Sequence, residues 1–466
     1  MYSELFKLLG YEQDEIERER PRIDKAFEKL KIGPDDIKRA EKKMKENFDT
    51  EFIGTRKLLG AYMKEFINLV LTKEEGKRWV YTPSPPFPLV IDALRIASRD
   101  KGVYVSPISW FFATCLGGMF DKINPFLEAG EAAGLKPGLA HCAFNQIDIG
   151  SVTTGVMPPP AMAVDYRYFC DQGPEATELI HYLFDCPIAY IDYCPDLDRH
   201  KLSETPVRNI KYFAGELKRA FDKFGDVMGY EVTDEHKRET LAQNGAYWMT
   251  LQGLLAILRT SDPQPIGLPE LSLLTFSTFC IPDKDKVIEI VAMFTEEAKE
   301  RVAKGKGVVK KGAPRVYILL PSMVDPTVNS MIQNLGLAVP AQLHIPLVAQ
   351  EMTPVESTTP EEQMAEFALK RMVFKGSASM IEYIKTVCED WNLDGAIMSY
   401  QFSCRPITTI ALMTKEKIMK ELGIPVLVLE MDVLDPRDYS AGQLKTRVET
   451  FAELLKARKA ATRKAA

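Results

Sequence analysis

The sequence predicts a two-lobed α/β fold with parallel sheets, and three observations lead to this prediction. Short β-rich runs alternate with helical patterns from about residue 79 and again from about residue 316, an alternation typical of parallel sheets that carry helices on their faces. The chain has 466 residues, more than the roughly 250–300 at which a single core stops growing. A Gly/Lys-rich stretch at 304–312 separates the two alternating regions. Each lobe is therefore expected to be Rossmann-like or flavodoxin-like.

The same patterns divide the chain into four segments. Residues 1–78 combine dense charge with heptad-like apolar spacing, so they are expected to form a helical N-terminal segment. Residues 79–204 are expected to form the first α/β lobe and residues 305–466 the second. Residues 205–304 show helical spacing almost throughout and are expected to be a helical connector.

Several predicted strands end at residues that can do chemistry. The expected strands are 79–81, 103–105, 138–140, 161–164 and 188–191 in the first lobe, and 316–320, 395–398 and 426–429 in the second. In open α/β sheets, ligands bind at the carboxyl ends of the strands. In the first lobe these ends are followed by Ser84, Ser106, Cys142, Cys170 and Cys194.

Composition and charge exclude several classes of protein. Lys and Arg number 59 and Asp and Glu 65, a net charge of −6, which argues against a nucleic-acid partner. The N-terminal residues lack the apolar region of a signal peptide. No run reaches the roughly 18 apolar residues that a membrane span needs. We therefore expect a cytoplasmic protein with no membrane partner, whose eight cysteines are reduced thiols or metal ligands.

The cysteines contain no Cys-x-x-Cys pair, which argues against structural zinc, thioredoxin-like and ferredoxin-like sites. Any metal site must then be assembled by folding. Cys142, Cys170 and Cys404 follow predicted strands, whereas Cys280 and Cys388 lie in apolar helical patterns and are expected to be small buried side chains. Two interpretations stay open from the residues alone: an iron–sulfur site built from separate loops, or a cluster-free α/β binding protein whose thiols are incidental.

An ordered series of motifs carries a family resemblance. It is strongest in the second lobe, through the segments 393–397, 403–406, 423–425, 432–437 and 446–449 with Ser440 and Gln443. The first lobe matches more loosely, through Ser84 with Phe87-Pro88, then Cys142 and Cys170. Over about residues 75–450, the chain resembles the family of 2-hydroxyacyl-CoA dehydratase and ATP-dependent benzoyl-CoA reductase subunits, of the 2-hydroxyglutaryl-CoA dehydratase D-component type.

The resemblance implies a cofactor, a reaction and partners. Cys142, Cys170 and Cys404 are expected to bind a [4Fe–4S] cluster and to leave one iron without a cysteine. An ATP-dependent iron–sulfur activator protein would deliver one electron, and a homologous second subunit would complete the enzyme. In a dehydratase, a ketyl radical of the 2-hydroxyacyl-CoA loses its hydroxyl group. In a reductase, the electrons stay in the acyl group. A non-catalytic electron-transfer or scaffold subunit is the remaining alternative.

Other residues beside the expected cluster have candidate roles. Ser84 is expected either to hydrogen-bond to the open iron's ligand or the thioester oxygen, or to be a turn serine between Pro83 and Pro85. His141 is expected to move a proton or to hydrogen-bond beside the ligand that follows it. Arg405 is a candidate for balancing thiolate charge.

Further features of the sequence concern structural ion pairs, acid–base catalysis and nucleotide binding. Arg437 with Asp432 and Asp435 is typical of a structural ion-pair network. Related dehydratases commonly carry an acidic residue after a Tyr-Pro where this chain has Ser106-Pro107-Ile108. A general acid or base for dehydration is therefore either missing at this position or supplied from elsewhere, for example by a partner subunit, which weakens the case for a dehydratase over a reductase. The chain contains no P-loop and no dinucleotide fingerprint, so we expect it to bind neither ATP nor NAD itself.

Overall fold

Two parallel sheets form the frame of the protein in a computed structural model that describes residues 2–84, 87–136, 141–167, 170–193, 206–343, 355–371 and 377–465. The first sheet has the strand order β2-β1-β3-β4 and the second has β6-β5-β7-β8. All pairings within both sheets are parallel. The predicted two-lobed α/β class is therefore confirmed.

The strands lie close to where the sequence pattern predicts them. The first sheet consists of β1 (Arg78–Tyr81), β2 (Val103–Ser106), β3 (Met162–Tyr166) and β4 (Ile188–Ile191). The second consists of β5 (Arg315–Ile318), β6 (Ala338–Gln342), β7 (Gly395–Tyr400) and β8 (Val426–Glu430). Sequence analysis missed β6 because Pro340 interrupts its pattern, and a proline is tolerated there because β6 is an edge strand. The strand expected at 138–140 lies outside the described residues.

The two lobes share one topology. In each, the second strand along the chain lies at one edge, followed across the sheet by the first, third and fourth strands. This arrangement reverses direction between β1 and β3 in the first lobe, and between β5 and β7 in the second. Ligands of open α/β sheets bind at the carboxyl ends of strands where the order reverses. The fold therefore offers two such positions.

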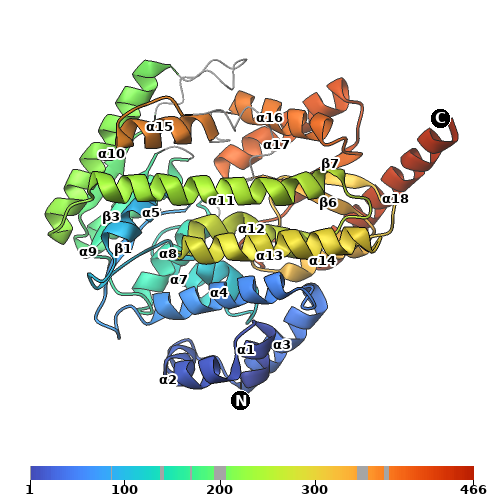
Figure 1. The fold of residues 1–466 in the computed structure, drawn as a ribbon. Coiled ribbons are helices and arrows are strands. Elements are labelled where there is room, and N and C mark those ends of the chain that lie inside the picture. Colours follow the sequence, from blue (N-terminus) through green and yellow to red (C-terminus); the bar gives the residue numbers. More distant parts are fainter. Residues whose placement is uncertain are drawn as a thin grey trace.

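Helices cover both sheets and join them. The N-terminal segment contains α1 (Ser3–Leu8), α2 (Gln13–Lys29), α3 (Pro34–Asn47) and α4 (Ile53–Val70). The connector contains α10 (Val207–Met228), α11 (Asp234–Thr260), α12 (Leu268–Cys280) and α13 (Lys284–Ala303). Both regions are helical as predicted. Helices α11 and α13 run side by side across the molecule (Figure 1).

The remaining helices lie within and around the lobes. In the first half of the chain they are α5 (Pro88–Ala97), α6 (Ser109–Phe111), the π-helix η1 (Phe112–Gly117), α7 (Asn124–Ala132), α8 (Ala143–Thr153) and α9 (Gln172–Phe184). In the second half they are α14 (Pro326–Asn334), α15 (Pro360–Arg371), α16 (Ser377–Asp390), α17 (Arg405–Glu421) and α18 (Ala441–Ala465). Although α15 comes late in the chain, it packs against α10 beside the first sheet (Figure 1).

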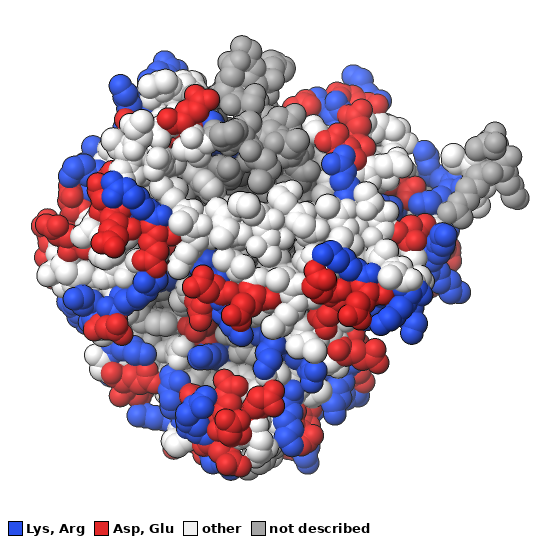
Figure 2. All heavy atoms as spheres, in the orientation of Figure 1, with Lys and Arg blue, Asp and Glu red and all other residues white. Residues whose placement is uncertain are grey.

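The surface and the helices add two observations. Figure 2 shows basic and acidic side chains interspersed on the face it presents, so this face carries no extended field of one sign. Within the described part of the chain, no helix has the length and apolar character needed to cross a membrane.

Helices α7 and α8 approach closely at two glycines. A Cβ atom added to Gly150 of α8 would lie 1.9 Å from the carbonyl oxygen of Phe126, and one added to Gly130 of α7 would lie 2.3 Å from that of Gln146. Neither backbone atom can move without separating the helices. The position of α8, which begins directly after Cys142, therefore depends on the absence of a side chain at Gly150.

We predict that the substitution Gly150→Ala lowers the free energy of unfolding by about 1–3 kcal/mol, because it overpacks the α7–α8 contact. Gly245→Ala is the matched control, since Gly245 lies within α11 and has no atom within 4 Å of an added Cβ. The control should raise stability by up to about 1 kcal/mol. Urea denaturation measures both variants, and equal midpoints for Gly150→Ala and wild type would contradict the account.

Candidate functional site

A cavity lies between the two lobes, and side chains of both lobes line it. The first lobe contributes Ser84, Trp110, Cys142, Phe144, Cys170 and Gln172 to its wall. The second lobe contributes Leu320, Met323, Gln401, Cys404, Arg405, Pro406, Ile407 and Val433. Three thiols and a few polar groups therefore meet in a wall that is otherwise mostly apolar.

The cavity lies where the strand order of each sheet reverses. Ser84 follows β1 and Cys170 follows β3, the two strands that flank the reversal in the first sheet. Leu320 follows β5 and Cys404 follows β7, which flank the reversal in the second. The two ligand-binding positions of the fold thus face each other and form a single site.

Each of the three thiols also lies at the start of a helix. Cys142 is the residue directly before α8, Cys404 is directly before α17, and Cys170 comes two residues before α9. The first turn of a helix exposes unpaired N–H groups and carries partial positive charge, which favours a thiolate. The partially positive N-terminal ends of three helices that are far apart in the sequence therefore lie at one cavity.

Burial works against ionisation of these thiols. It raises the pKa of Cys142, and the neighbouring charge of Cys404 raises it further, while the amide of Phe144 acts in the opposite direction. Burial likewise raises the pKa of Cys404, with a further contribution from Cys170. For Cys170, burial raises the pKa and the amides of Gln172 and Gly173 oppose it. Because each ionised thiol disfavours the next, a cationic group is needed to hold all three as thiolates.

Two kinds of metal site can be compared with the three thiols. Among the described residues, no group of three or more His, Cys, Asp or Glu side chains is arranged to hold a single metal ion. A single zinc ion needs all of its ligands within about 2.0–2.3 Å of one centre. A cluster instead binds each cysteine to a different iron, so its ligands lie farther apart. Thiols are the donor type that iron–sulfur clusters bind, so the chemistry of the three side chains fits such a group.

Gln172 ties together the segments that carry the three thiols. Its side-chain oxygen accepts a hydrogen bond from the main-chain N–H of Cys142 at 2.9 Å, and its amide nitrogen donates to the carbonyl of Ser403 at 3.2 Å. Its own carbonyl accepts from Asn145 at 2.7 Å. Gln172 is buried and begins the helix that follows Cys170. Sequence analysis missed it, and its position two residues after Cys170 is the only signal that points to it.

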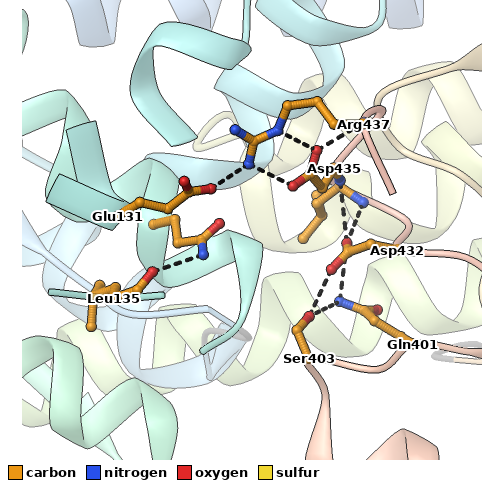
Figure 3. A network of polar contacts seen from close by, with 9 residues as sticks. Glu131, Leu135, Gln401, Ser403, Asp432, Asp435 and Arg437 are labelled. Atoms are coloured by element: carbon orange, nitrogen blue, oxygen red, sulfur yellow. Dashed lines mark hydrogen bonds and ion pairs between the residues drawn. The ribbon is translucent and has the colours of Figure 1, made fainter. Parts of the chain in front are cut away.

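Asp432 fixes the loop that carries Cys404, as Figure 3 shows. Its carboxylate accepts hydrogen bonds from the hydroxyl of Ser403 at 2.6 Å, the amide nitrogen of Gln401 at 3.2 Å and the main-chain N–H of Leu434 at 2.8 Å. Burial raises the pKa of Asp432 to about 6. Ser403, the residue before Cys404, is thus held in place by Asp432, which lies in the loop after β8.

Two arginines join the lobes near the cavity. Arg437 pairs with Asp435 at 2.7 Å and with Glu131 of the first lobe at 2.5 Å (Figure 3). The structural network predicted for Arg437 therefore includes Asp435 and reaches Glu131, and Asp432 is joined to it by accepting a hydrogen bond from the main-chain N–H of Asp435 at 3.2 Å. Arg405 lines the cavity and pairs with Asp171 at 2.5 Å and Glu175 at 3.5 Å. Its guanidinium thus already faces two carboxylates of the first lobe.

The structure places Ser84 in the cavity wall and His141 outside it. Ser84 is buried, and its hydroxyl oxygen lies 2.7 Å from that of Ser109. His141 precedes Cys142, is absent from the cavity lining, and its Nδ1 has no hydrogen-bond partner among the described residues. Ser106 donates to the carbonyl of Pro107 and also lies outside the lining.

An aromatic group forms one side of the cavity. The ring of Trp110 lies 4.8 Å from that of Phe144 and 4.3 Å from that of Phe276, measured between centroids. The indole N–H of Trp110 is buried and has no acceptor in the described part of the chain. Buried donors are usually paired, so this N–H is a candidate donor to a bound ligand. No periodicity in the sequence singled out this residue.

The other cysteines lie away from the cavity lining. Cys115, Cys186, Cys280 and Cys388 are buried, and Cys388 lies within α16 as expected of a small buried side chain. Cys194, which sequence analysis noted at a strand end, lies outside the described residues. In the part of the chain that the structure describes, the thiols that line the cavity are therefore Cys142, Cys170 and Cys404, the three that the resemblance implies.

The fold and the site place this chain in a class of two-lobed α/β proteins that have a thiol-lined cavity between the lobes. The family model described as "2-hydroxyglutaryl-CoA dehydratase, D-component" matches residues 113–455. The chain belongs to this family, and the resemblance noted from its motifs is confirmed.

Several named relatives have low sequence identity to this chain but align with most of its length. The (R)-phenyllactyl-CoA dehydratase alpha subunit of Clostridium sporogenes is 22% identical over 72% of this chain and 81% of its own length. The (R)-2-hydroxyisocaproyl-CoA dehydratase alpha subunit of Clostridioides difficile is 21% identical over 71% and 81%. A benzoyl-CoA reductase subunit of Thauera aromatica is 22% identical over 72% and 81%.

We predict that Gln172→Ala loosens the segment around Cys142. The substitution removes the acceptor of the Cys142 N–H and should lower the free energy of unfolding by about 1–3 kcal/mol, because buried polar partners are left unpaired. Hydrogen exchange of the peptide spanning residues 141–147 should become faster. Gln363→Ala, which removes a hydrogen bond to the carbonyl of Ser357, should leave that peptide unchanged. Equal exchange in wild type and Gln172→Ala would refute the role of this side chain.

Proposed function

We propose that this chain is the cluster-bearing subunit of a 2-hydroxyacyl-CoA dehydratase. The observation that carries the proposal is the meeting of Cys142, Cys170 and Cys404, each at a helix start, in one cavity between two sheet ends. Family membership and the dehydratase alpha subunits among its relatives support the proposal. The substrate is a CoA thioester whose acyl group enters this cavity.

Three residues would hold the cofactor. Cys142, Cys170 and Cys404 would each bind one iron of a [4Fe–4S] cluster, and no fourth thiol lines the cavity among the described residues. A cluster bound there would supply single-electron chemistry to the thioester. Gln172 and Asp432 hold the cysteine-bearing segments in place, since both contact Ser403 or Cys142 directly.

The cavity wall suggests how the substrate is bound. Trp110, Phe144, Leu320, Met323 and Val433 would pack against the acyl group and exclude water from it. The unpaired N–H of Trp110 and the hydroxyl of Ser84 are candidate donors to the thioester or hydroxyl oxygen.

Two protein partners are proposed, an activator protein and a second subunit. The family resemblance implies an ATP-dependent iron–sulfur activator protein that would deliver the electron, and the sequence itself contains no P-loop. The alpha-subunit names of the relatives support a second, homologous subunit in the active enzyme. The alternative is a subunit of a benzoyl-CoA reductase-type enzyme, which the likeness to the reductase of Thauera aromatica favours.

We predict that Cys142→Ser, Cys170→Ser and Cys404→Ser each lower the iron and acid-labile sulfide content of anaerobically purified protein. Wild type should hold about four irons and four sulfides per chain, as a [4Fe–4S] cluster requires. Cys388→Ser is the matched control, because Cys388 is buried in α16 away from the cavity, and it should keep the wild-type content. Full content in all three cavity variants would exclude these ligands.

A turnover assay tests the reaction itself. The chain is combined with its second subunit and activator, and 2-hydroxyacyl-CoA and benzoyl-CoA are compared as substrates. A dehydratase returns the electron, so it should form many product molecules per electron supplied. A reductase should consume two electrons for each product molecule. Electron consumption in proportion to product would contradict dehydration and favour the reductase alternative.

A further inference from the structure

A path of hydroxyl groups leads from the cavity into the first lobe. Ser84 lines the cavity, and its hydroxyl oxygen lies 2.7 Å from that of Ser109 at the start of α6. Ser109 in turn contacts Asp148 of α8, whose carboxylate accepts from the main-chain N–H of Ser109 at 2.9 Å. The hydroxyl of Ser109 also faces this carboxylate and lowers its pKa. Both serines are buried, so the path is shielded from solvent.

The carboxyl group of Asp148 does not line the cavity and has no role in holding the proposed cluster. Its side chain is fully buried, and its second oxygen accepts a hydrogen bond from the hydroxyl of Tyr81 at 2.9 Å. No Lys or Arg of the described residues pairs with it. Burial raises its pKa to about 7, while the hydrogen bonds from Tyr81 and Ser109 act in the opposite direction. A group of this kind changes its protonation near neutral pH.

Side chains from several elements surround the carboxyl group of Asp148. Tyr81 of β1 and Ser109 of α6 face it, and no described charged side chain of α7 or α9 forms a hydrogen bond or ion pair with it. Asp165 of β3 and Cys186 lie beyond, where they raise the pKa of Tyr81. In the sequence, Asp148 lies between Ile147 and Ile149 on an apolar helix, where a charged residue is unusual.

We propose that Asp148 exchanges a proton with the substrate in the cavity through the hydroxyls of Ser109 and Ser84. This inference rests on the proposed dehydration. Ser84 is the catalytic residue of the path because it alone lines the cavity, and Ser109 and Asp148 act through it. The path supplies the carboxyl group that is missing beside Ser106 and Pro107.

The proton and electron balance closes over one turnover. When the C2–O bond of the substrate breaks, its electron pair leaves with the hydroxide, which takes a proton from Ser84 and departs as water. Ser84 regains a proton from Ser109, and Ser109 regains one from Asp148. When the C3–H bond breaks, its electron pair stays with the acyl group and its proton returns along the same path to the Asp148 carboxylate. The single electron supplied at the start then leaves the acyl group and is available for the next turnover. The product is the 2-enoyl-CoA, and Asp148 is protonated again.

The activity arm of the test uses the assembled enzyme and three variants. Asp148→Asn should lower kcat by about 10²–10⁴-fold, the usual contribution of acid–base catalysis, and should abolish the fall of kcat toward high pH. Ser109→Ala should lower kcat comparably. Tyr81→Phe should keep activity but move that fall to higher pH, because the lost hydrogen bond had lowered the pKa of Asp148. A structural role alone would not shift the pH profile in this direction.

The second arm needs no activity, so it separates this inference from the proposed function. Infrared spectra of the isolated chain should show a protonated carboxyl band that titrates near pH 7 and disappears in Asp148→Asn. Asp165→Asn is the matched control, since Asp165 is also buried with a pKa raised to about 7 but makes no hydrogen bond to Ser84 or Ser109. The control should keep the Asp148 band, and Ser109→Ala should slow deuterium exchange of that band.

The outcomes of the two arms are distinct. A missing Asp148 band, or deuterium exchange that Ser109→Ala leaves unchanged, would overturn the path even if the enzyme dehydrates its substrate. An Asp148→Asn enzyme with the wild-type pH profile would overturn it as well. Wild-type protein that acts on no CoA thioester would contradict the proposed function, and the infrared measurements would still decide whether the proton path exists.

Discussion

The site depends on three thiols, Cys142 buried and Cys170 and Cys404 half-buried, that meet in the cavity between the two sheets. Each thiol alone would be a neutral buried side chain, since burial raises its pKa. Together at three helix starts, they form a site whose charge only a cationic group can balance. The repeated strand order makes this possible, because it brings the strand reversals of both lobes to the same cavity.

The scaffold around the cavity explains why the thiols keep their positions. Gln172 joins the Cys142 and Ser403 segments, Asp432 holds Ser403 from the loop after β8, and Arg405 reaches back to Asp171. The contacts of Gln172 with Ser403 and of Arg405 with Asp171 cross from one lobe to the other. A movement of the lobes against each other would therefore break both contacts. The Gln172–Ser403 hydrogen bond is buried and costly to leave unmade, whereas the Arg405–Asp171 pair is exposed and contributes less.

Sequence patterns predicted much of this fold, because strands and helices leave periodic signals. Seven of the eight described strands lie at expected positions, and β6 was missed because Pro340 breaks its pattern. The three cysteines followed from family motifs, since no local spacing joins them. Gln172, Trp110 and Asp148 could not be predicted, because their roles arise from neighbours distant in sequence, such as Ser403, Phe276 and Tyr81.

Diffraction from anaerobically grown crystals, with data collected at the iron absorption edge, tests the central claim most directly. The account predicts one compact anomalous peak in the cavity between the lobes, in contact with the sulfur atoms of Cys142, Cys170 and Cys404 and open on the side of Ser84. An iron peak at other cysteines, or fully loaded protein with no peak in this cavity, would contradict it.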